Sequence, residues 1–515
     1  MAQSLMVVGT ASHVGKSLLT AAICRHLKRQ GYRVAPFKGQ NMALNAYVTQ
    51  EGLEMGHAQA VQAWAAGTEP QVAMNPILLK PQGNMTSQVI LRGRPVGQVQ
   101  AADYYRDYFE MGWQAIVESL ATLQTEFDWI VCEGAGSPAE INLKHRDLTN
   151  MRVAKHLNAA TLLVADIDRG GVFAHIVGTL ELLDPDERAL IRGIAINKFR
   201  GQRSLLDSGL TWLEERTGVP VIGVIPWIDQ VFPAEDSLSL MDRPTRGQAM
   251  DLTLAVIRLP RVANFTDFDP LEAEPTVQVR YIQPGQALGS PDAVILPGSK
   301  TTIADLQVLQ DSGLAAQIQA YAKSGGMVFG ICGGFQMLGQ WITDDTGIEG
   351  PSGTVPGLGL LPLKTQMQVD KITRQQTTQA RSLPAPFADI DASAGAIHGY
   401  EIHQGQTQYL TMKDLAPLFS DETLGVASCG DRIMGTYLHD LFNNGPWRRM
   451  WLNQLRRHKG LPPLTTQIPN YEVQREQLLD ELTDAVMPHL EGFTDFLGAP
   501  VGAHGRAPSS TGKTI

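Results

Sequence analysis

One cysteine stands where its thiol can act as a nucleophile. Cys332 lies in the run Gly-Ile-Cys-Gly-Gly-Phe-Gln-Met-Leu at residues 330–338, after an apolar run and before a helical pattern. Small neighbours permit the sharp turn that exposes a thiol. The helix N-terminus favours the thiolate and offers the amide of Gly333 to an oxyanion. We predict that Cys332 is catalytic, whereas the other three cysteines have the context of buried structural thiols.

A second segment has the composition of a phosphate-binding loop. Residues 9–17 read Gly-Thr-Ala-Ser-His-Val-Gly-Lys-Ser, again between an apolar run and a helical pattern. Gly9 and Gly15 let backbone N–H groups, that of Thr10 included, surround phosphate oxygens, while Lys16 adds charge and Ser17 can bind Mg²⁺. Five residues rather than the usual four precede Gly-Lys. The pattern predicts an ATP-binding P-loop, and an ordinary glycine-rich turn is the less favoured alternative.

Two polar residues follow other strand-like runs. The carboxyl ends of parallel strands are where open α/β sheets bind ligands. Glu133 ends one such run and can bind Mg²⁺ directly or through water, or it can merely cap the following loop. Asn197 ends another and is placed to contact a nucleotide base, although Asn-Lys is also a common turn dipeptide.

The cysteine segment resembles the signature of class I glutamine amidotransferases, including Gln336. By that resemblance, the loop containing Gly298 and Ser299 directs backbone amides at the oxyanion. His439, in Gly-Thr-Tyr-Leu-His, is the base that keeps Cys332 a thiolate and later protonates the leaving ammonia.

The histidine of this family is normally followed two positions later by a glutamate that orients it. Leu441 stands there instead, a lack typical of the cobyrinate amidases and their relatives. The site is therefore a dyad, or its third member comes from elsewhere. We take Glu401 as the candidate third member.

The first half of the chain is similar to dethiobiotin-synthetase-type P-loop enzymes, which use ATP to phosphorylate a carboxylate. The similarity lies in the five-residue spacer, Phe37-Lys38, the Glu-Gly-Ala-Gly run from Glu133 and the Asn-Lys pair at Asn197. It implies that Lys16 and Ser17 handle phosphate and Mg²⁺, that Glu133 binds Mg²⁺, that Asn197 contacts adenine, and that Lys38 lies near the transferred phosphoryl group.

Parallel sheets must position these residues. Apolar runs at residues 4–9, 128–133, 160–166, 193–197 and 219–225 alternate with helical patterns, the first at 16–30. A second series occupies 252–258, 277–282, 292–296 and 327–331. Near-continuous apolar strands separated by helices predict two doubly wound α/β domains.

Polar, aperiodic residues 241–251 predict the boundary between the domains. We expect a P-loop domain at 1–245, a flavodoxin-like amidotransferase domain at 251–447, a helical extension at 448–497 and a disordered tail at 498–515. Residues 365–394, rich in Gln, Thr, Ser and Pro, have the composition of an irregular insertion or of a polar edge.

A glutaminase joined to a carboxylate kinase makes amides. Residues 37–45 and 75–81 resemble the cobyric acid synthase family, and the resemblance covers roughly residues 1–490. It implies amidation of the b, d, e and g carboxylates of adenosylcobyrinic acid a,c-diamide, with ATP, Mg²⁺ and L-glutamine. Gln40 and Asn41 would contact the phosphoryl group or the corrinoid, and Lys38 and Lys80 would form a local cationic pocket for that acidic substrate.

Four other functions are possible. A lipid II or related cell-wall amidotransferase is disfavoured, since its two activities lie on separate chains. Cobyrinic acid a,c-diamide synthase is the nearest alternative, but that family typically has Lys-x-Gly-Pro-Asp-Tyr-Ile-Asp where Gln40-Asn41-Met42 stands here. A partition-type P-loop ATPase scaffold has no use for an activated thiol such as Cys332. A non-enzymatic corrinoid-binding module would not consume ATP and glutamine.

The amino-acid composition limits the binding partners and the cell compartment expected for this protein. The 515 residues carry 42 Lys and Arg against 52 Asp and Glu, a net charge of −10, which argues against nucleic-acid binding through a general basic surface. The four cysteines form no CxxC pair, and neither a signal peptide nor a membrane span is evident. We expect a cytoplasmic enzyme of unspecified oligomeric state.

Overall fold

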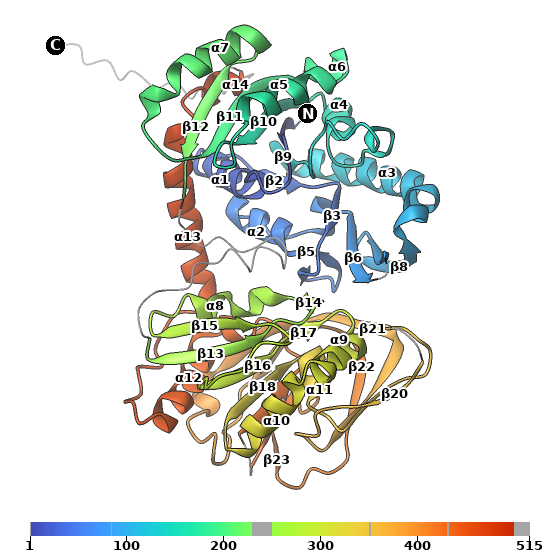
Figure 1. The fold of residues 1–515 in the computed structure, drawn as a ribbon, viewed down its shortest axis with the longest axis vertical. Coiled ribbons are helices and arrows are strands. Elements are labelled where there is room, and N and C mark those ends of the chain that lie inside the picture. The colour runs from blue at the N-terminus through green and yellow to red at the C-terminus, as the bar shows by residue number, and fades with distance from the viewer. Residues whose placement is uncertain (1, 84, 229–249, 350–351, 430–431, 499–515) are drawn as a thin grey trace, which may run out of the picture.

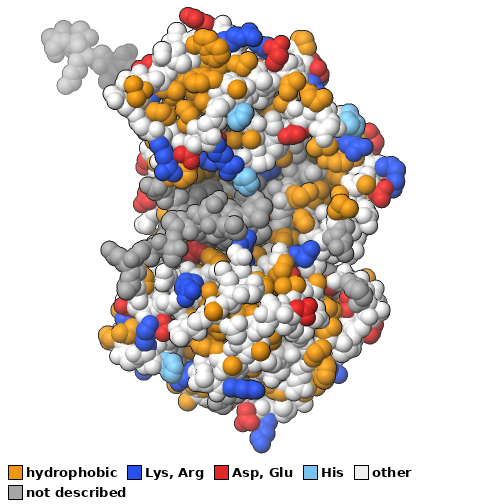
Figure 2. Space-filling model, viewed as in Figure 1, with side chains coloured by type: hydrophobic (Ala, Val, Ile, Leu, Met, Phe, Trp, Pro, Cys, Tyr) orange, Lys and Arg blue, Asp and Glu red, His pale blue; other side chains and the backbone are white. Residues whose placement is uncertain are grey.

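The computed structural model describes residues 2–83, 85–228, 250–349, 352–429 and 432–498, which form two α/β domains stacked along the long axis (Figure 1). Most of the boundary expected at residues 241–251, and nearly all of the tail expected to be disordered, lie outside the described residues. On the face shown in Figure 2, basic and acidic side chains are interspersed rather than gathered into one basic field.

A parallel six-stranded sheet forms the centre of the first domain, in the order β12-β11-β10-β1-β9-β2. The strands are β1 (Gln3–Gly9), β2 (Val34–Phe37), β9 (Trp129–Glu133), β10 (Ala160–Asp166), β11 (Ile191–Phe199) and β12 (Val221–Pro226). Five of them lie close to the predicted ranges, and no range is predicted for β2. The helices that flank the sheet are α1 (Lys16–Arg29), α3 (Ala101–Glu126), α4 (Met151–Leu157), α5 (Val172–Leu182), α6 (Pro185–Arg188) and α7 (Asp207–Thr217).

Alternation along β1 shows why the strands are apolar throughout. Leu5 and Val7 pack into one buried cluster with α1, while Met6 and Val8 pack into a second cluster with α3 and α5. Successive side chains of a strand point to opposite faces, so a sheet covered on both faces needs apolar residues at every position. The doubly wound prediction is confirmed for this domain.

Smaller elements of the first domain face the second domain. They are the sheet β3 (Gln40–Met42), β6 (Ile77–Gly83), β7 (Thr86–Leu91) and β8 (Arg94–Gln100), the pair β4 (Ala46–Val48) and β5 (Glu54–Gly56), and α2 (His57–Ala66). In Figure 1, β3, β5, β6 and β8 lie on the side of the first domain nearest the second.

The second domain has a seven-stranded sheet in the order β15-β13-β16-β18-β25-β24-β23. Its strands are β13 (Leu252–Ile257), β15 (Val277–Ile282), β16 (Ala293–Leu296), β18 (Met327–Ile331), β23 (Leu415–Pro417), β24 (Gly425–Ser428) and β25 (Ile433–Thr436). β24 pairs antiparallel with both β25 and β23 at one edge, and the other pairs are parallel. The helices between them are α8 (Asp269–Glu272), α9 (Thr302–Asp311), α10 (Leu314–Lys323) and α11 (Gly333–Met337), and β14 (Val262–Ala263) pairs with β17 (Gly298–Ser299).

The polar segment at residues 365–394 is only partly irregular. Its first half belongs to β21 (Leu363–Gln379), which pairs antiparallel with β22 (Ala396–Tyr409) in a sheet with β19 (Trp341–Asp344) and β20 (Gly353–Pro356). An antiparallel strand can leave one face in solvent, so the Gln and Thr residues of β21 are compatible with a long strand. The irregular-insertion interpretation is wrong for this part. β21 is not an edge strand either, because it lies between β19 and β22 in the sheet.

The end of the chain divides between the domains. Helix α12 (Gly445–His458) packs in the second domain, with Trp447 and Trp451 5.8–6.1 Å from Phe329 between ring centroids. Helix α13 (Tyr471–Val486) then returns to the first domain, where Arg25 of α1 donates to Asp480 at 2.7 Å, and α14 (Phe493–Leu497) follows (Figure 1). None of the helices in the described ranges is both long and apolar enough to cross a bilayer.

Candidate active sites

The loop between β1 and α1 is folded as a phosphate cradle. Gly15 has φ +99°, a conformation that L side chains rarely adopt, and a Cβ there would lie 2.2 Å from Nδ2 of Asn197. Nζ of Lys16 donates to the carbonyl oxygens of Ala11 and Gly136 at 3.0 and 3.1 Å, which holds its charge at the loop. The arrangement brings backbone N–H groups and a buried ammonium to the N-terminus of a helix, where anions bind.

Glu133 joins this loop to the neighbouring strand. Its carboxylate is 1% exposed, and it accepts from Ser17 Oγ at 2.7 Å, from Lys38 Nζ at 3.1 Å and from Gln62 Nε2 at 2.6 Å. A hydroxyl and a carboxylate side by side are the hard oxygen donors that Mg²⁺ prefers, together with water and phosphate oxygens. Ser17 and Glu133 therefore fit the predicted Mg²⁺ site, and Lys38 is buried beside them rather than facing solvent.

The other residues predicted around the nucleotide are bonded within the domain. Asn197 donates through Nδ2 to Val14 O at 2.8 Å and so braces the P-loop. Gln40 accepts from the hydroxyl of Tyr104 at 2.6 Å, and Asn41 donates to Gln59 at 3.0 Å. Contact of Asn197 with adenine, and of Gln40 and Asn41 with substrate, stay predictions.

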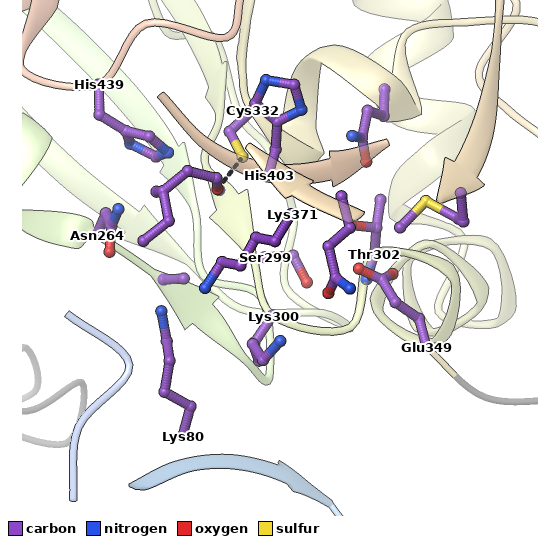
Figure 3. A pocket seen from close by; sticks show the side chains of 16 residues that line it. Lys80, Asn264, Ser299, Lys300, Thr302, Cys332, Glu349, Lys371, His403 and His439 are labelled. Atoms are coloured by element: carbon purple, nitrogen blue, oxygen red, sulfur yellow. Dashed lines mark hydrogen bonds between the residues drawn. The ribbon is translucent and has the colours of Figure 1, made fainter. Parts of the chain in front are cut away.

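Cys332 occupies the predicted elbow between β18 and α11. Its backbone has φ 51° and ψ −109°, a sparsely populated conformation for a non-glycine residue. A Cβ on Gly330 would lie 2.6 Å from Gly334 O, and one on Gly334 would lie 2.0 Å from Leu296 O, so the turn needs its glycines. Cys332 is 7% exposed, and its Sγ lies 3.7 Å from Ile402 O (Figure 3).

The predicted oxyanion residues gather around the thiol. A Cβ on Gly298 would lie 3.8 Å from Cβ of Cys332 and 3.2 Å from Cε1 of His439, which places this glycine between the two. A Cβ on Gly333 would lie 2.9 Å from the backbone nitrogen of Ser299. The two peptide segments therefore lie together beside the cysteine, as an oxyanion site requires.

His439 follows β25, and its ring points toward Cys332 (Figure 3). Its third partner is Asp267, not Glu401. Nδ1 of His439 donates to Oδ2 of Asp267 at 2.7 Å, and the other carboxylate oxygen accepts from the backbone N–H of Asp440 at 2.8 Å. Sequence reasoning missed Asp267 because it lies 172 residues before the histidine, with no family spacing to indicate it.

Glu401 serves a different histidine. It accepts from Arg374 Nε at 2.6 Å and Gln376 Nε2 at 2.7 Å, and it lies 3.2 Å from Nε2 of His403. The ring of His403 stacks on Tyr437 with 3.8 Å between centroids. The prediction that Glu401 orients His439 is wrong, because the carboxylate is already committed to this cluster.

Electrostatics favour the protonated form of His439. Burial by itself lowers the pKa of this imidazole, but the carboxylate of Asp267, followed by Cys332, outweighs burial and raises it to about 10. A histidine held as imidazolium beside a thiol stabilises the thiolate, which is the nucleophilic form.

A pocket runs from the thiol to the seam between the domains. It is lined by Cys332, His439 and Gln336 at one end and by three lysines, Lys80 of β6, Lys300 and Lys371 of β21, at the other (Figure 3). The buried carboxylate of Glu54 bridges Lys80 at 2.6 Å and Lys371 at 2.5 Å. Lys80, predicted to bind the corrinoid, is paired with Glu54 at this pocket, and its contact with the corrinoid stays a prediction. The polar composition of residues 365–394 gives no indication that Lys371 lies here.

A nucleophilic cysteine with a histidine and an aspartate, on the same chain as a phosphate cradle next to a buried carboxylate, defines an ATP-dependent glutamine amidotransferase, an amide ligase. Two family models match the chain: a CobQ/CobB/MinD/ParA nucleotide binding domain at residues 5–239 and a CobB/CobQ-like glutamine amidotransferase domain at residues 253–447.

Relatives of known name are similar over nearly the whole chain. The cobyric acid synthase of Acaryochloris marina is 68% identical over 495 residues, covering 96% of this chain and 99% of the relative. That of Thermosynechococcus vestitus is 66% identical over 490 residues, covering 95% and 98%. The chain belongs to the cobyric acid synthase family.

Proposed function

We propose that this protein is a cobyric acid synthase that converts the b, d, e and g carboxylates of adenosylcobyrinic acid a,c-diamide into amides, using ATP and glutamine for each. The observation that supports it most is the coexistence in one chain of the Ser17–Glu133–Lys38 cluster and the Cys332–His439–Asp267 cluster. The names of relatives 61–68% identical supply the substrate class.

The first centre activates a carboxylate. A substrate carboxylate oxygen attacks the γ-phosphorus of ATP, ADP leaves, and an acyl phosphate forms. The P-loop amides and Lys16 hold the phosphates, and the ammonium of Lys38 offsets charge on the transferred group. Ser17 and Glu133 would hold Mg²⁺, which neutralises phosphate charge when bound.

The second centre releases ammonia. His439 holds the proton of Cys332, the thiolate attacks the side-chain amide carbon of glutamine, and amides near Gly298, Ser299 and Gly333 stabilise the oxyanion. His439 then gives its proton to the departing nitrogen, and water hydrolyses the thioester to glutamate. Ammonia attacks the acyl phosphate and displaces phosphate, which completes the amide.

The reaction is best assigned to the cytoplasm, where ATP and glutamine are available. The four cysteines are free thiols, in keeping with a reducing compartment.

Mass spectrometry of the corrinoid tests the substrate assignment. Incubation of the full chain with the a,c-diamide, ATP, Mg²⁺ and glutamine should give the product in which four hydroxyl groups are replaced by amino groups. Omission of corrinoid should leave ATP largely unspent. Conversion of cobyrinic acid to its diamide, with the diamide itself untouched, would instead indicate cobyrinic acid a,c-diamide synthase.

Two variants test the proposal that carboxylate activation and ammonia release occur at separate centres. Cys332→Ser should lose glutamine-supported amidation but keep activity with added ammonium salt, because the acyl phosphate still forms. Lys16→Ala should lose both glutamine-supported and ammonia-supported amidation, since no acyl phosphate forms when Lys16 does not hold the γ-phosphate. Retained amide synthesis in Lys16→Ala, or loss of ammonia-supported activity in a folded Cys332→Ser, would contradict the two-centre mechanism.

A further inference from the structure

The first domain touches the second directly behind the catalytic histidine. A small apolar cluster joins Ala43, Ala46 and Val48 of the first domain to Tyr400 and Ile402 of β22, and each of these side chains is at most 7% exposed. Since β22 also passes beside His439, this contact connects the ATP-binding domain to the glutaminase centre.

Two asparagines pair reciprocally across the contact. Oδ1 of Asn45 accepts from the backbone N–H of Phe265 at 2.9 Å, and Oδ1 of Asn264 accepts from the backbone N–H of Ala46 at 3.1 Å. Both asparagines are buried, at 1% and 2% exposure. A buried N–H that loses its acceptor is costly, so each bond holds its segment against displacement.

The segment held by Asn45 carries the aspartate of the catalytic centre. Asn264 has a left-handed backbone, φ 53°, and begins the 3₁₀ turn of Phe265–Phe268. Its carbonyl accepts from the N–H of Asp267 at 3.1 Å. Asp267 in turn accepts from His439, so the position of the turn determines the position of the imidazole.

Tyr400 makes a second contact, with the face of the His439 ring. Tyr400 stacks on His439 with centroids 5.2 Å apart and planes 18° apart, and the hydroxyl of Tyr400 donates to Ala46 O at 3.1 Å. The backbone of Ala46 is thus bonded on both sides, through its N–H to Asn264 and through its oxygen to Tyr400.

The docking segment begins at the ATP site. Lys38, paired with Glu133, is followed within the same short stretch by Asn45. Asn75 fixes the beginning of that stretch by donating to Lys38 O at 3.0 Å, and it also accepts from Gly56 N at 2.9 Å. One continuous segment therefore contacts the phosphoryl centre at one end and the support of His439 at the other.

We propose that Asn45, a residue of the ATP-binding domain, is a positioning residue for glutamine hydrolysis: it fixes the turn that carries Asp267 and thereby aligns His439 with Cys332. Efficient ammonia release then depends on the docked arrangement of the two domains. The inference rests on the proposed function only for the glutaminase half-reaction. The glutamine hydrolysis assay needs no corrinoid, whereas the ammonia-supported control uses the corrinoid substrate.

Steady-state glutamine hydrolysis by Asn45→Ala tests the proposal. We expect kcat to fall about 10–100-fold, the scale of a small misplacement of a catalytic group, with KM nearly unchanged because Asn45 does not line the pocket. Ammonia-supported amidation should stay within about twofold of wild type, which also shows that the variant is folded. Gln98→Ala is the matched control, because it removes another cross-domain hydrogen bond, to Ile348 O, away from His439, and should leave kcat unchanged.

The pH dependence of Cys332 alkylation by iodoacetamide distinguishes misalignment of His439 from a general loosening of the fold. The titratable groups that face the His439–Cys332 pair are Asp267, Asp440, Tyr400, Tyr437 and Lys371. Misalignment of His439 weakens its support of the thiolate, so the alkylation profile of Asn45→Ala should move to higher pH while that of Gln98→Ala coincides with wild type. An unchanged profile, an unchanged glutaminase kcat, or an equal loss of ammonia-supported activity would overturn the proposal.

A milder variant covers the case in which Asn45→Ala does not fold. Tyr400→Phe keeps the ring on His439 and removes only the bond to Ala46 O. Its glutaminase kcat should fall by less than that of Asn45→Ala, with ammonia-supported activity intact. Wild-type hydrolysis in Tyr400→Phe together with a misfolded Asn45→Ala would count against the proposal.

Discussion

At the scale of single residues, the proposed glutaminase centre differs from the usual class I amidotransferase pattern in the origin of its orienting carboxylate. Leu441, buried, takes the position of the usual glutamate, and Asp267 reaches His439 from a turn after β14. The replacement keeps the physical role, because a carboxylate on Nδ1 fixes both the tautomer and the ring plane. Orientation is thus supplied by a different segment.

We predict that Asp267→Asn lowers glutamine-supported turnover about 10²–10⁴-fold, the usual range for losing a general acid–base, and spares ammonia-supported amidation. Glu401→Gln is the matched control and should retain glutaminase activity within about tenfold, because Glu401 does not contact His439. Equal effects of the two substitutions on kcat would contradict the assignment of Asp267.

Asp267→Asn should also change how the free energy of unfolding depends on pH. Because the pKa of His439 is raised to about 10 from 6.5, its charge stabilises the fold fully below pH 6.5, and that contribution is lost as pH rises through about 10. Asp267→Asn removes the main cause of the raised pKa. Denaturant titrations between pH 7 and pH 10 should therefore show a smaller decline for Asp267→Asn than for wild type.

At the scale of elements, α13 is the least expected feature. The helical pattern near the end of the chain predicts a helix, but not that it packs on α1 of the first domain. Leu479, Leu482 and Val486 enter the buried cluster of Leu5 and Val7, and Arg25 anchors the helix through Asp480 and Glu476. The first domain is therefore completed by residues that follow the second.

Leu482→Ala should destabilise the first domain by about 2–5 kcal/mol, because it leaves a cavity against α1. Urea denaturation measures this change in the free energy of unfolding, and ammonia-supported activity is followed in the same samples. Val473→Ala lies on the same helix, where Val473 is 51% exposed, and should change stability little. Equal effects of the two would contradict the packing of α13 as a core element.

At the scale of the whole molecule, a buried ion cluster spans the seam between the domains. Glu54 of the first domain bridges Lys80 of its own domain and Lys371 of the second. Burial raises the pKa of Glu54, but Lys371 and then Lys80 outweigh burial and lower it to about 2. Lys80 and Lys371 also line the pocket of Cys332, so the cluster connects the docking of the domains to the geometry of the proposed glutaminase centre.

Glu54→Gln should cost about 3–5 kcal/mol, since it leaves two buried ammonium groups without their shared carboxylate. The pKa of Glu54 lies below its ordinary 4.5, so its contribution is present above pH 4.5 and is lost as pH falls toward about 2. Denaturant titrations of the wild type should show this decrease in the free energy of unfolding as pH falls, and those of Glu54→Gln should not. Asp103→Asn, which breaks the exposed pair with Arg106, should cost at most about 1 kcal/mol.

The elements whose chemistry is local could be predicted from the amino-acid sequence. The P-loop, the Cys332 elbow and the apolar strands follow from residues adjacent in the chain, since glycine conformations, helix N-termini and two-sided burial act over a few positions. Contacts between groups far apart in the chain became evident only in the folded molecule. The pairing of Asp267 with His439, the use of Glu401 by His403, the strand within the polar segment and the return of α13 depend on packing between segments far apart in sequence. No local pattern encodes such contacts, because a side chain's partner is fixed only once the sheets and domains have docked.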